Sequence, residues 1–130
     1  MKQERIRQIV VAAVGLLYVG LLYPLSTDLW HSNWLLQMNK EGECEPMFLA
    51  FFVALGFFLL LAARKPVEYH TLILFAAWHS FAHSAVMAIQ TSEAYSHGIH
   101  RDFKDVVITA VIGVVLLVLV PTRREAAATA

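Results

Sequence analysis

Four long apolar stretches, separated by short polar segments, make up most of the chain. A membrane-spanning helix needs about 20 predominantly apolar residues, and each stretch reaches or approaches that length. The segments between them hold nearly all of the charged residues. The pattern predicts a single all-α domain, residues 1–130, that forms a polytopic membrane protein with a four-helix transmembrane bundle. The predicted spans are about 8–24, 46–64, 70–90 and 104–120.

Prolines mark the boundaries of these stretches. Pro24, Pro66 and Pro121 follow the first, second and fourth stretches, and a proline disfavours helix at the residue before it. Pro46 opens the second stretch, where its missing N–H costs nothing. The first stretch resembles a signal peptide, but it lacks a small-x-small cleavage site before Asp28. We therefore interpret it as a retained membrane helix that ends at Pro24.

Residues 26–39 have a different character from the four spans. Trp30, Trp34 and Met38 recur every four residues among polar ones, and tryptophan favours the headgroup region of a bilayer. The segment is predicted to form an interfacial amphipathic helix, with Ser26 or Thr27 capping its start. At the other end of the chain, residues 122–130 are predicted to be a flexible tail.

The charges differ between the two sides of this predicted bundle. One side carries seven basic and three acidic residues, whereas the other carries three basic and seven acidic residues. The positive-inside rule then places both termini in the cytoplasm and the interfacial helix on the outer face. The chain as a whole is 58% hydrophobic, with a mean hydropathy of +0.60 and no net charge. The predicted partners are therefore the lipid bilayer and other membrane subunits or a second copy, and not nucleic acid.

The third span carries polar residues that membrane helices seldom hold. With about 100° between successive helical residues, its polar and sulfur-containing side chains share one face: His79, Ser80, His83, Met87 and Gln90. The opposite face is apolar: Leu74, Trp78, Phe81 and Ile89. Because polar groups are costly in lipid, the first face is predicted to point toward protein or a bound ligand.

The histidine pair on this face has several interpretations. In the plainest one, each imidazole hydrogen-bonds a neighbouring helix. Alternatively, His79 and His83 lie one turn apart and can share a metal ion, or either imidazole can ligate one. A bis-histidine haem would need a homodimer, because the other three spans contain no histidine. A chlorophyll-type tetrapyrrole needs a single axial ligand, so the candidate cofactor-binding residues are His79, His83, Met87 and Gln90.

A weaker metal candidate lies in the polar segment after the third span. His97, His100 and Asp102 have a spacing that suits zinc or copper, with His31 as a fourth ligand. Loop histidines are more often simply solvated, and Gly98 reduces the preorganisation of the loop.

Several absences weigh against catalysis and transport. Cys44 is the single cysteine, which excludes an intramolecular disulfide and a cysteine-based metal cage. No acidic residue lies inside the apolar core of a span, as proton-coupled transport would require, and there is no nucleotide-binding loop or catalytic triad motif. Catalysis is the least supported class.

Short motifs along the chain resemble a family of uncharacterised small bacterial membrane proteins with four spans. They are Leu22-Tyr23-Pro24, residues 56–66 (GFFLLLAARKP), residues 83–90 (HSAVMAIQ) and the closing Pro121-Thr122-Arg123-Arg124. The resemblance implies a four-helix bundle in the bacterial inner membrane, and it brings no activity with it. His79, His97 and His100 are not part of the resembling pattern.

The sequence thus favours a small membrane accessory subunit or binding bundle that presents its histidine face to a partner helix or a hydrophobic ligand. Two alternatives stay open. One is a tetrapyrrole-binding subunit, of chlorophyll or haem type, ligated by His79 or His83. The other is a small membrane enzyme that acts on a lipid or quinone.

Overall fold

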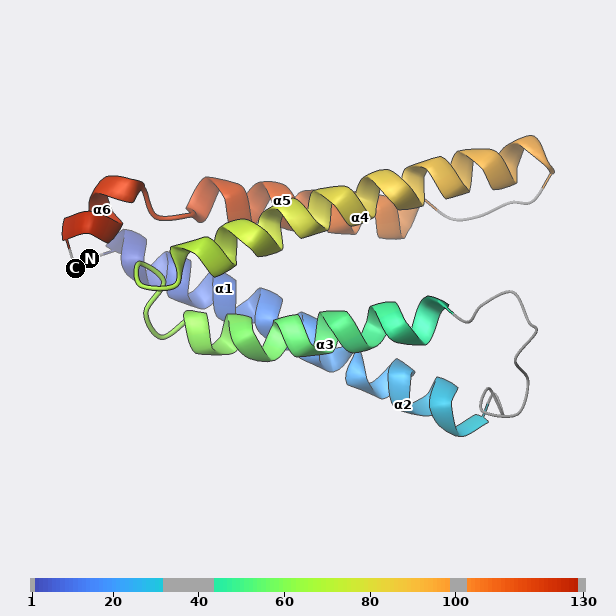
Figure 1. Cartoon of the computed structure of the whole chain (residues 1–130), viewed down its shortest axis with the longest axis horizontal. Helices are drawn as coiled ribbons and strands as arrows, with labels where there is room; N and C mark the ends of the chain where they lie inside the picture. Colours follow the sequence, from blue (N-terminus) through green and yellow to red (C-terminus); the bar gives the residue numbers. More distant parts are fainter. Residues whose placement is uncertain (1, 32–43, 99–102, 129–130) are drawn as a thin grey trace.

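The computed structural model describes residues 2–31, 44–98 and 103–128. Within these ranges every regular element is a helix, which confirms the all-α prediction. The helices are α1 (Lys2–Gly20), α2 (Leu22–His31), α3 (Cys44–Ala62), α4 (His70–Ser96), α5 (Lys104–Leu119) and α6 (Arg123–Ala128). Figure 1 shows an elongated bundle in which the start of α1, the turn between α3 and α4, and α6 lie at the same end.

The long helices associate as two pairs. Helix α1 packs mainly against α3, and α4 packs mainly against α5, whereas the contacts between the two pairs are fewer. Two stretches are long and apolar enough to cross a membrane, residues Lys2–Thr27 and His70–Ser96. The apolar part of α3, Met47–Ala62, is shorter.

Glycines set the closest helix contacts. A Cβ atom added to Gly56 would lie 2.8 Å from the carbonyl oxygen of Gly15 and 2.8 Å from the Cβ of Tyr18, so α1 and α3 touch backbone to backbone there. A Cβ on Gly113 of α5 would lie 3.2 Å from the carbonyl oxygen of Ala77 in α4. Small residues permit this close approach, so the α1–α3 pair and the α4–α5 pair each come closest at a glycine.

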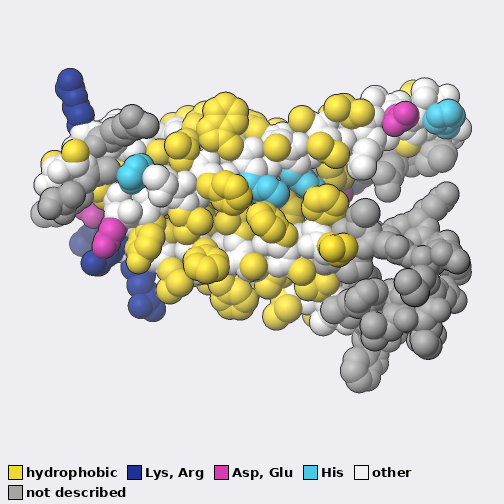
Figure 2. All heavy atoms as spheres, viewed as in Figure 1, with side chains coloured by type: hydrophobic (Ala, Val, Ile, Leu, Met, Phe, Trp, Pro, Cys, Tyr) yellow, Lys and Arg dark blue, Asp and Glu magenta, His cyan; other side chains and the backbone are white. Residues whose placement is uncertain are grey.

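The core runs along the inner faces of α1, α3, α4 and α5. Its least exposed large side chains include Val11, Leu59, Ile73 and Leu116. Large apolar side chains also lie on the outer surface of these four helices: Leu16, Leu17, Phe57, Phe58, Trp78, Ile89, Val111 and Val118. Figure 2 shows hydrophobic side chains spread over the middle of the bundle, with basic side chains gathered near one end.

The structure corrects the predicted end of the first helix. After a turn at Leu21, α2 continues through Pro24 to His31. Pro24 is the third residue of α2, where the backbone N–H has no intrahelical acceptor, so its ring is tolerated. Residues 26–31 of the predicted interfacial helix therefore belong to α2, and residues 32–39 lie outside the described residues. Ser26 does not cap a helix start, because its hydroxyl donates to the carbonyl of Tyr23.

Two later boundaries also differ. Helix α4 continues beyond Gln90 to Ser96, where the sequence suggested a polar loop. The hydroxyls of Ser92 and Ser96 donate to carbonyls three residues earlier, and Gly98 follows at φ 75°, a conformation that ends helices. In the predicted flexible tail, residues 123–128 form α6.

A small charged network joins the two ends of the described chain. Arg7 of α1 donates to the Glu125 carboxylate of α6 at 3.1 Å, and the Thr122 backbone N–H donates to the same oxygen at 2.9 Å. These two donors, the Thr122 N–H foremost, lower the pKa of the Glu125 carboxyl below its usual range. In the turn before α4, Glu68 raises the pKa of the Lys65 ammonium by accepting a hydrogen bond at 3.0 Å.

Candidate functional site

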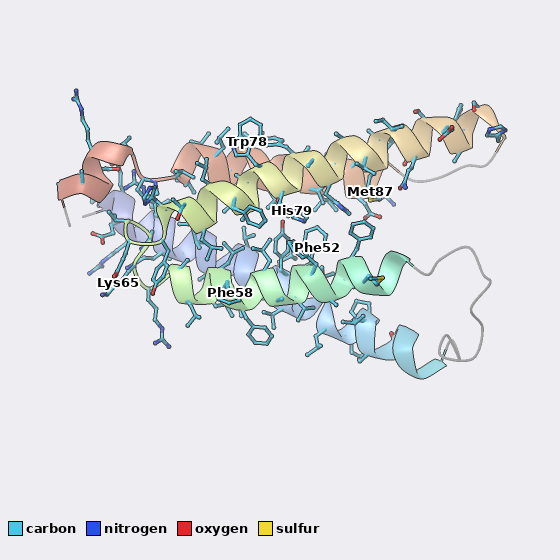
Figure 3. The ribbon with its side chains drawn as sticks, in the orientation of Figure 1. Phe52, Phe58, Lys65, Trp78, His79 and Met87 are labelled. Atoms are coloured by element: carbon cyan, nitrogen blue, oxygen red, sulfur yellow. The ribbon has the colours of Figure 1, made fainter. Side chains whose placement is uncertain are left out.

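The two histidines of the third predicted span lie on successive turns of α4 and face α3. Phe52 of α3 contacts both, with its ring centre 5.1 Å from that of His79 and 4.9 Å from that of His83. Figure 3 shows the His79 and Phe52 side chains projecting toward each other from the two helices. The imidazole centres themselves are 6.2 Å apart, with ring planes inclined at 30°. The predicted histidine face is therefore directed at a neighbouring helix.

Phenylalanines surround the imidazole pair. The ring of Phe51 lies 4.6 Å from that of His79, and the ring of Phe75, one turn before His79 on α4, lies 6.1 Å away in a stacked arrangement. Phe48 approaches His83 at 5.8 Å. Figure 2 shows histidine side chains in the middle of a face that hydrophobic side chains otherwise cover. The imidazoles consequently lie in an apolar, aromatic environment at the α3–α4 contact.

One nitrogen of this pair has no hydrogen-bond partner. The Nε2 atom of His79 is buried and finds no hydrogen-bond donor or acceptor. Among the described residues, no other buried side-chain nitrogen or oxygen lacks a partner. Leaving such a group unpaired costs about 1–3 kcal/mol. The rest of the His79 and His83 side chains is half-buried. The fold thus keeps an imidazole nitrogen available inside an apolar contact.

Two hydroxyls fix the rotation of α4 so that this face points inward. The Ser80 hydroxyl donates to the carbonyl of Ala76, and the Tyr18 hydroxyl of α1 lies 2.9 Å from the Ser80 oxygen. The Ser84 hydroxyl donates to the carbonyl of Val106 in α5 at 2.9 Å. Tyr18 also packs edge-on against Phe52, with ring centres 4.9 Å apart. The α1, α3 and α5 helices therefore all contribute to the position of the imidazoles.

Sequence reasoning identified part of this arrangement. Ser80 was placed on the polar face and is buried, and Met87 is half-buried on the same side of α4. Gln90 is exposed, so it lies outside the buried part of that face. On the opposite face, Trp78 and Ile89 are exposed, in agreement with their position away from the histidines in the helical pattern.

Leu74 and Phe81 of the predicted apolar face are half-buried instead. The reason is clear for Phe81, which packs at the Gly113 contact with α5. Helical periodicity divides α4 into two faces, but α4 contacts both α3 and α5. Part of the face opposite the histidines is therefore covered as well.

Tyr18, Phe52 and Ser84 were missed. Tyr18 did carry a signal, because it is the single hydroxyl-bearing side chain within residues 9–22. Phe52 carried none, since it is one of several phenylalanines in a uniformly apolar stretch.

The predicted outer metal set is not assembled in the part of the chain that the structure describes. His97 lies exposed at the end of α4. His100 and Asp102 lie outside the described residues, as does the side chain of His31. Among the described residues no group of three or more His, Cys, Asp or Glu side chains is positioned to hold a metal ion.

A family model, described as a family of unknown function (DUF6632), matches residues 2–128 of the chain. No curated protein and no solved structure matches it. The match agrees with the resemblance to uncharacterised proteins, and it assigns no role to any residue of the site.

Proposed function

We propose a function from the site itself, because the chain belongs to DUF6632, a family of unknown function. The protein is a small binding bundle of the bacterial inner membrane, and it holds a ligand at the α3–α4 contact through the imidazoles of His79 and His83. It acts on its own or as an accessory subunit of a larger membrane assembly, and it has no catalytic role of its own.

Three observations support the membrane location. The most apolar stretches of Lys2–Thr27 and His70–Ser96 are each only 28% buried, whereas the core helix of a soluble protein is mostly buried. Large apolar side chains lie on the outside of four helices. The start of α1 and α6 lie at one end, as two cytoplasmic termini require.

Four spans are proposed, formed by α1 with α2, α3, α4 and α5. Helix α5 has 16 residues, which corresponds to roughly 24 Å, and the apolar part of α3 is similarly short. A short span is accommodated by local thinning of the bilayer. Retention of the protein in the membrane pellet after alkaline extraction tests the location. A C-terminal reporter that is active only in the cytoplasm tests the orientation, and activity of a periplasmic reporter there would contradict it.

The unpartnered Nε2 of His79 carries the proposal of binding. A buried nitrogen without a partner destabilises the fold. Such destabilising residues are expected at sites where ligand binding offsets the loss of stability. Phe51 and Phe75 border the site and are 42% and 51% exposed, so they can move outward and give a ligand access from the side of the bundle.

The first experiment is to purify the whole chain in mild detergent and to determine what it carries. A visible absorption spectrum, mass spectrometry of an organic extract and a metal assay are made on the same sample. We expect about one equivalent of a bound species in wild type, lost in His79→Ala. His70→Ala is the matched control, because His70 begins the same helix and already has Val67 O as its partner. Identical contents in all three samples would refute the proposed function.

A further inference from the structure

We propose that the ligand is a monovalent copper ion, Cu(I), held by His79 and His83 with Met87 as a third, weaker ligand. The inference rests on the proposed function of this face and names its occupant. The three residues stand four apart along α4, so they follow one another on one side of the helix. All three side chains are half-buried.

The separation of the imidazoles suits a single bridging ion. A metal lies about 2.0–2.1 Å from an imidazole nitrogen and hence roughly 3 Å from the ring centre. Two rings on opposite sides of one ion therefore have centres about 6 Å apart, and those of His79 and His83 are 6.2 Å apart. The distance between the rings thus matches two nitrogens on opposite sides of one ion, and the stacked rings, with 30° between their planes, would turn about their side-chain torsions to direct those nitrogens at it.

The chemistry of the ligands also favours Cu(I). Imidazole suits copper, and a thioether such as that of Met87 is a soft ligand that selects Cu(I) over harder cations. All three ligands are neutral, so the bound ion keeps its full charge. The cost of placing an ion in an apolar medium grows with the square of its charge, so a dication pays about four times as much as a monovalent ion.

The surroundings can stabilise one positive charge. The ring of Phe48 lies 5.8 Å from His83 and that of Phe51 4.6 Å from His79, and the face of an aromatic ring attracts cations. A tetrapyrrole, by contrast, would have to displace several of the phenylalanine rings that contact the imidazoles, whereas a single ion is far smaller.

The test is an anaerobic competition titration of the purified chain with Cu(I) and a coloured Cu(I) chelator. We expect one Cu(I) per chain in wild type, an affinity lower by at least about 100-fold in His79→Ala or His83→Ala, and lower by about tenfold in Met87→Leu. His70→Ala is the control and should bind as wild type. X-ray absorption of the loaded protein should report two nitrogen ligands and one sulfur. Circular dichroism and gel filtration verify that each variant is folded.

Several outcomes would overturn the copper assignment. Absence of Cu(I) binding, equal affinity for Zn(II), or binding that survives His79→Ala each contradicts it. A co-purified tetrapyrrole or organic ligand that is lost in His79→Ala also overturns it, but leaves the proposed binding function standing. If His79→Ala changes neither Cu(I) binding nor the co-purified species, both proposals fail.

Discussion

Helix α3 meets its two neighbours in opposite ways. Toward α1 it presents Gly56 against Gly15, and the two backbones approach each other closely there. Toward α4 it presents phenylalanine rings against imidazoles, and one buried nitrogen there has no partner. We call these contacts the glycine contact (Gly15, Gly56) and the imidazole contact (Phe51, Phe52, His79, His83). The glycine contact is closely packed, whereas the imidazole contact leaves a buried nitrogen unpaired, which under the proposed function is a ligating atom.

The difference predicts which contact stabilises the fold and which one serves the proposed binding function. Close backbone approach maximises dispersion contacts and leaves no polar group unpaired. The imidazole contact, by contrast, retains an unpaired nitrogen that costs about 1–3 kcal/mol. Substitutions at the glycine contact should therefore change folding alone, whereas substitutions at the imidazole contact should separate folding from binding.

The largest effect is expected at the glycine contact. In Gly56→Val the new Cβ would lie 2.8 Å from the Gly15 carbonyl and from the Val19 nitrogen, both of which are backbone atoms that cannot swing away. We expect a loss of about 3 kcal/mol in the free energy of unfolding, the upper part of the range for overpacking. Stepwise addition of SDS to the purified protein, followed by circular dichroism, measures it.

Gly20→Ala is the matched control for that substitution. Gly20 ends α1, the helix against which Gly56 packs, and no atom lies within 4 Å of a Cβ added to it. Alanine is the better helix former, so the variant should be as stable as wild type or more stable, by up to about 1 kcal/mol. Equal losses in Gly56→Val and Gly20→Ala would show that the glycine contact does not stabilise the bundle.

The second prediction concerns the hydrogen bond that links the two helix pairs. Ser80→Ala removes the acceptor of the Tyr18 hydroxyl and leaves that hydroxyl buried, which should cost about 2 kcal/mol of unfolding free energy. Tyr18→Phe should cost less, about 1 kcal/mol, because the Ser80 hydroxyl still donates to Ala76. SDS unfolding of both single variants and the double variant measures the coupling. Strictly additive losses would contradict a direct interaction between the two hydroxyls.

The contrast between the two contacts also shows how far the sequence could be interpreted. The lengths of the apolar stretches predicted the long helices. In an apolar environment the backbone N–H and C=O groups need partners within the chain, and a helix provides them within one segment. Helical periodicity placed Ser80 and the histidines on one face. It could not identify Phe52 as the neighbour of the histidines or Gly56 as the neighbour of Gly15, since the pattern of one helix does not say which other helix it meets.

The misplaced boundaries have local causes of the same kind. Pro24 was expected to end a helix, because a proline in a helix interior breaks it. The turn at Leu21 places Pro24 in the first turn of α2, where a proline is tolerated. Helix α4 continues to Ser96 with serine hydroxyls that donate to its own carbonyls, and polar composition does not distinguish such a helix end from a loop.

The third prediction separates stability from binding at the imidazole contact. His79→Leu replaces the unpaired nitrogen by apolar atoms of similar size, so the unfolding free energy should rise by about 1 kcal/mol while the proposed ligand is lost. Trp78→Leu, at the neighbouring but exposed position, should change neither by much. The measurements are SDS unfolding and the content of bound species. A destabilised His79→Leu would indicate that the imidazole serves packing.

The smallest effect is expected at the charged end, which lies apart from both contacts. The Thr122 N–H and, after it, Arg7 stabilise the ionised form of Glu125, so its pKa is lower in the folded than in the unfolded chain. The resulting stabilisation is complete above the usual glutamate pKa of about 4.3 and disappears as pH falls through the lower folded pKa. The unfolding midpoint of wild type should therefore drop slightly more than that of Glu125→Gln between about pH 6 and pH 3. The effect should be small because the pair is solvent-screened. Parallel pH curves for the two proteins would show that the hydrogen bonds to the Glu125 carboxylate add no stability to the fold.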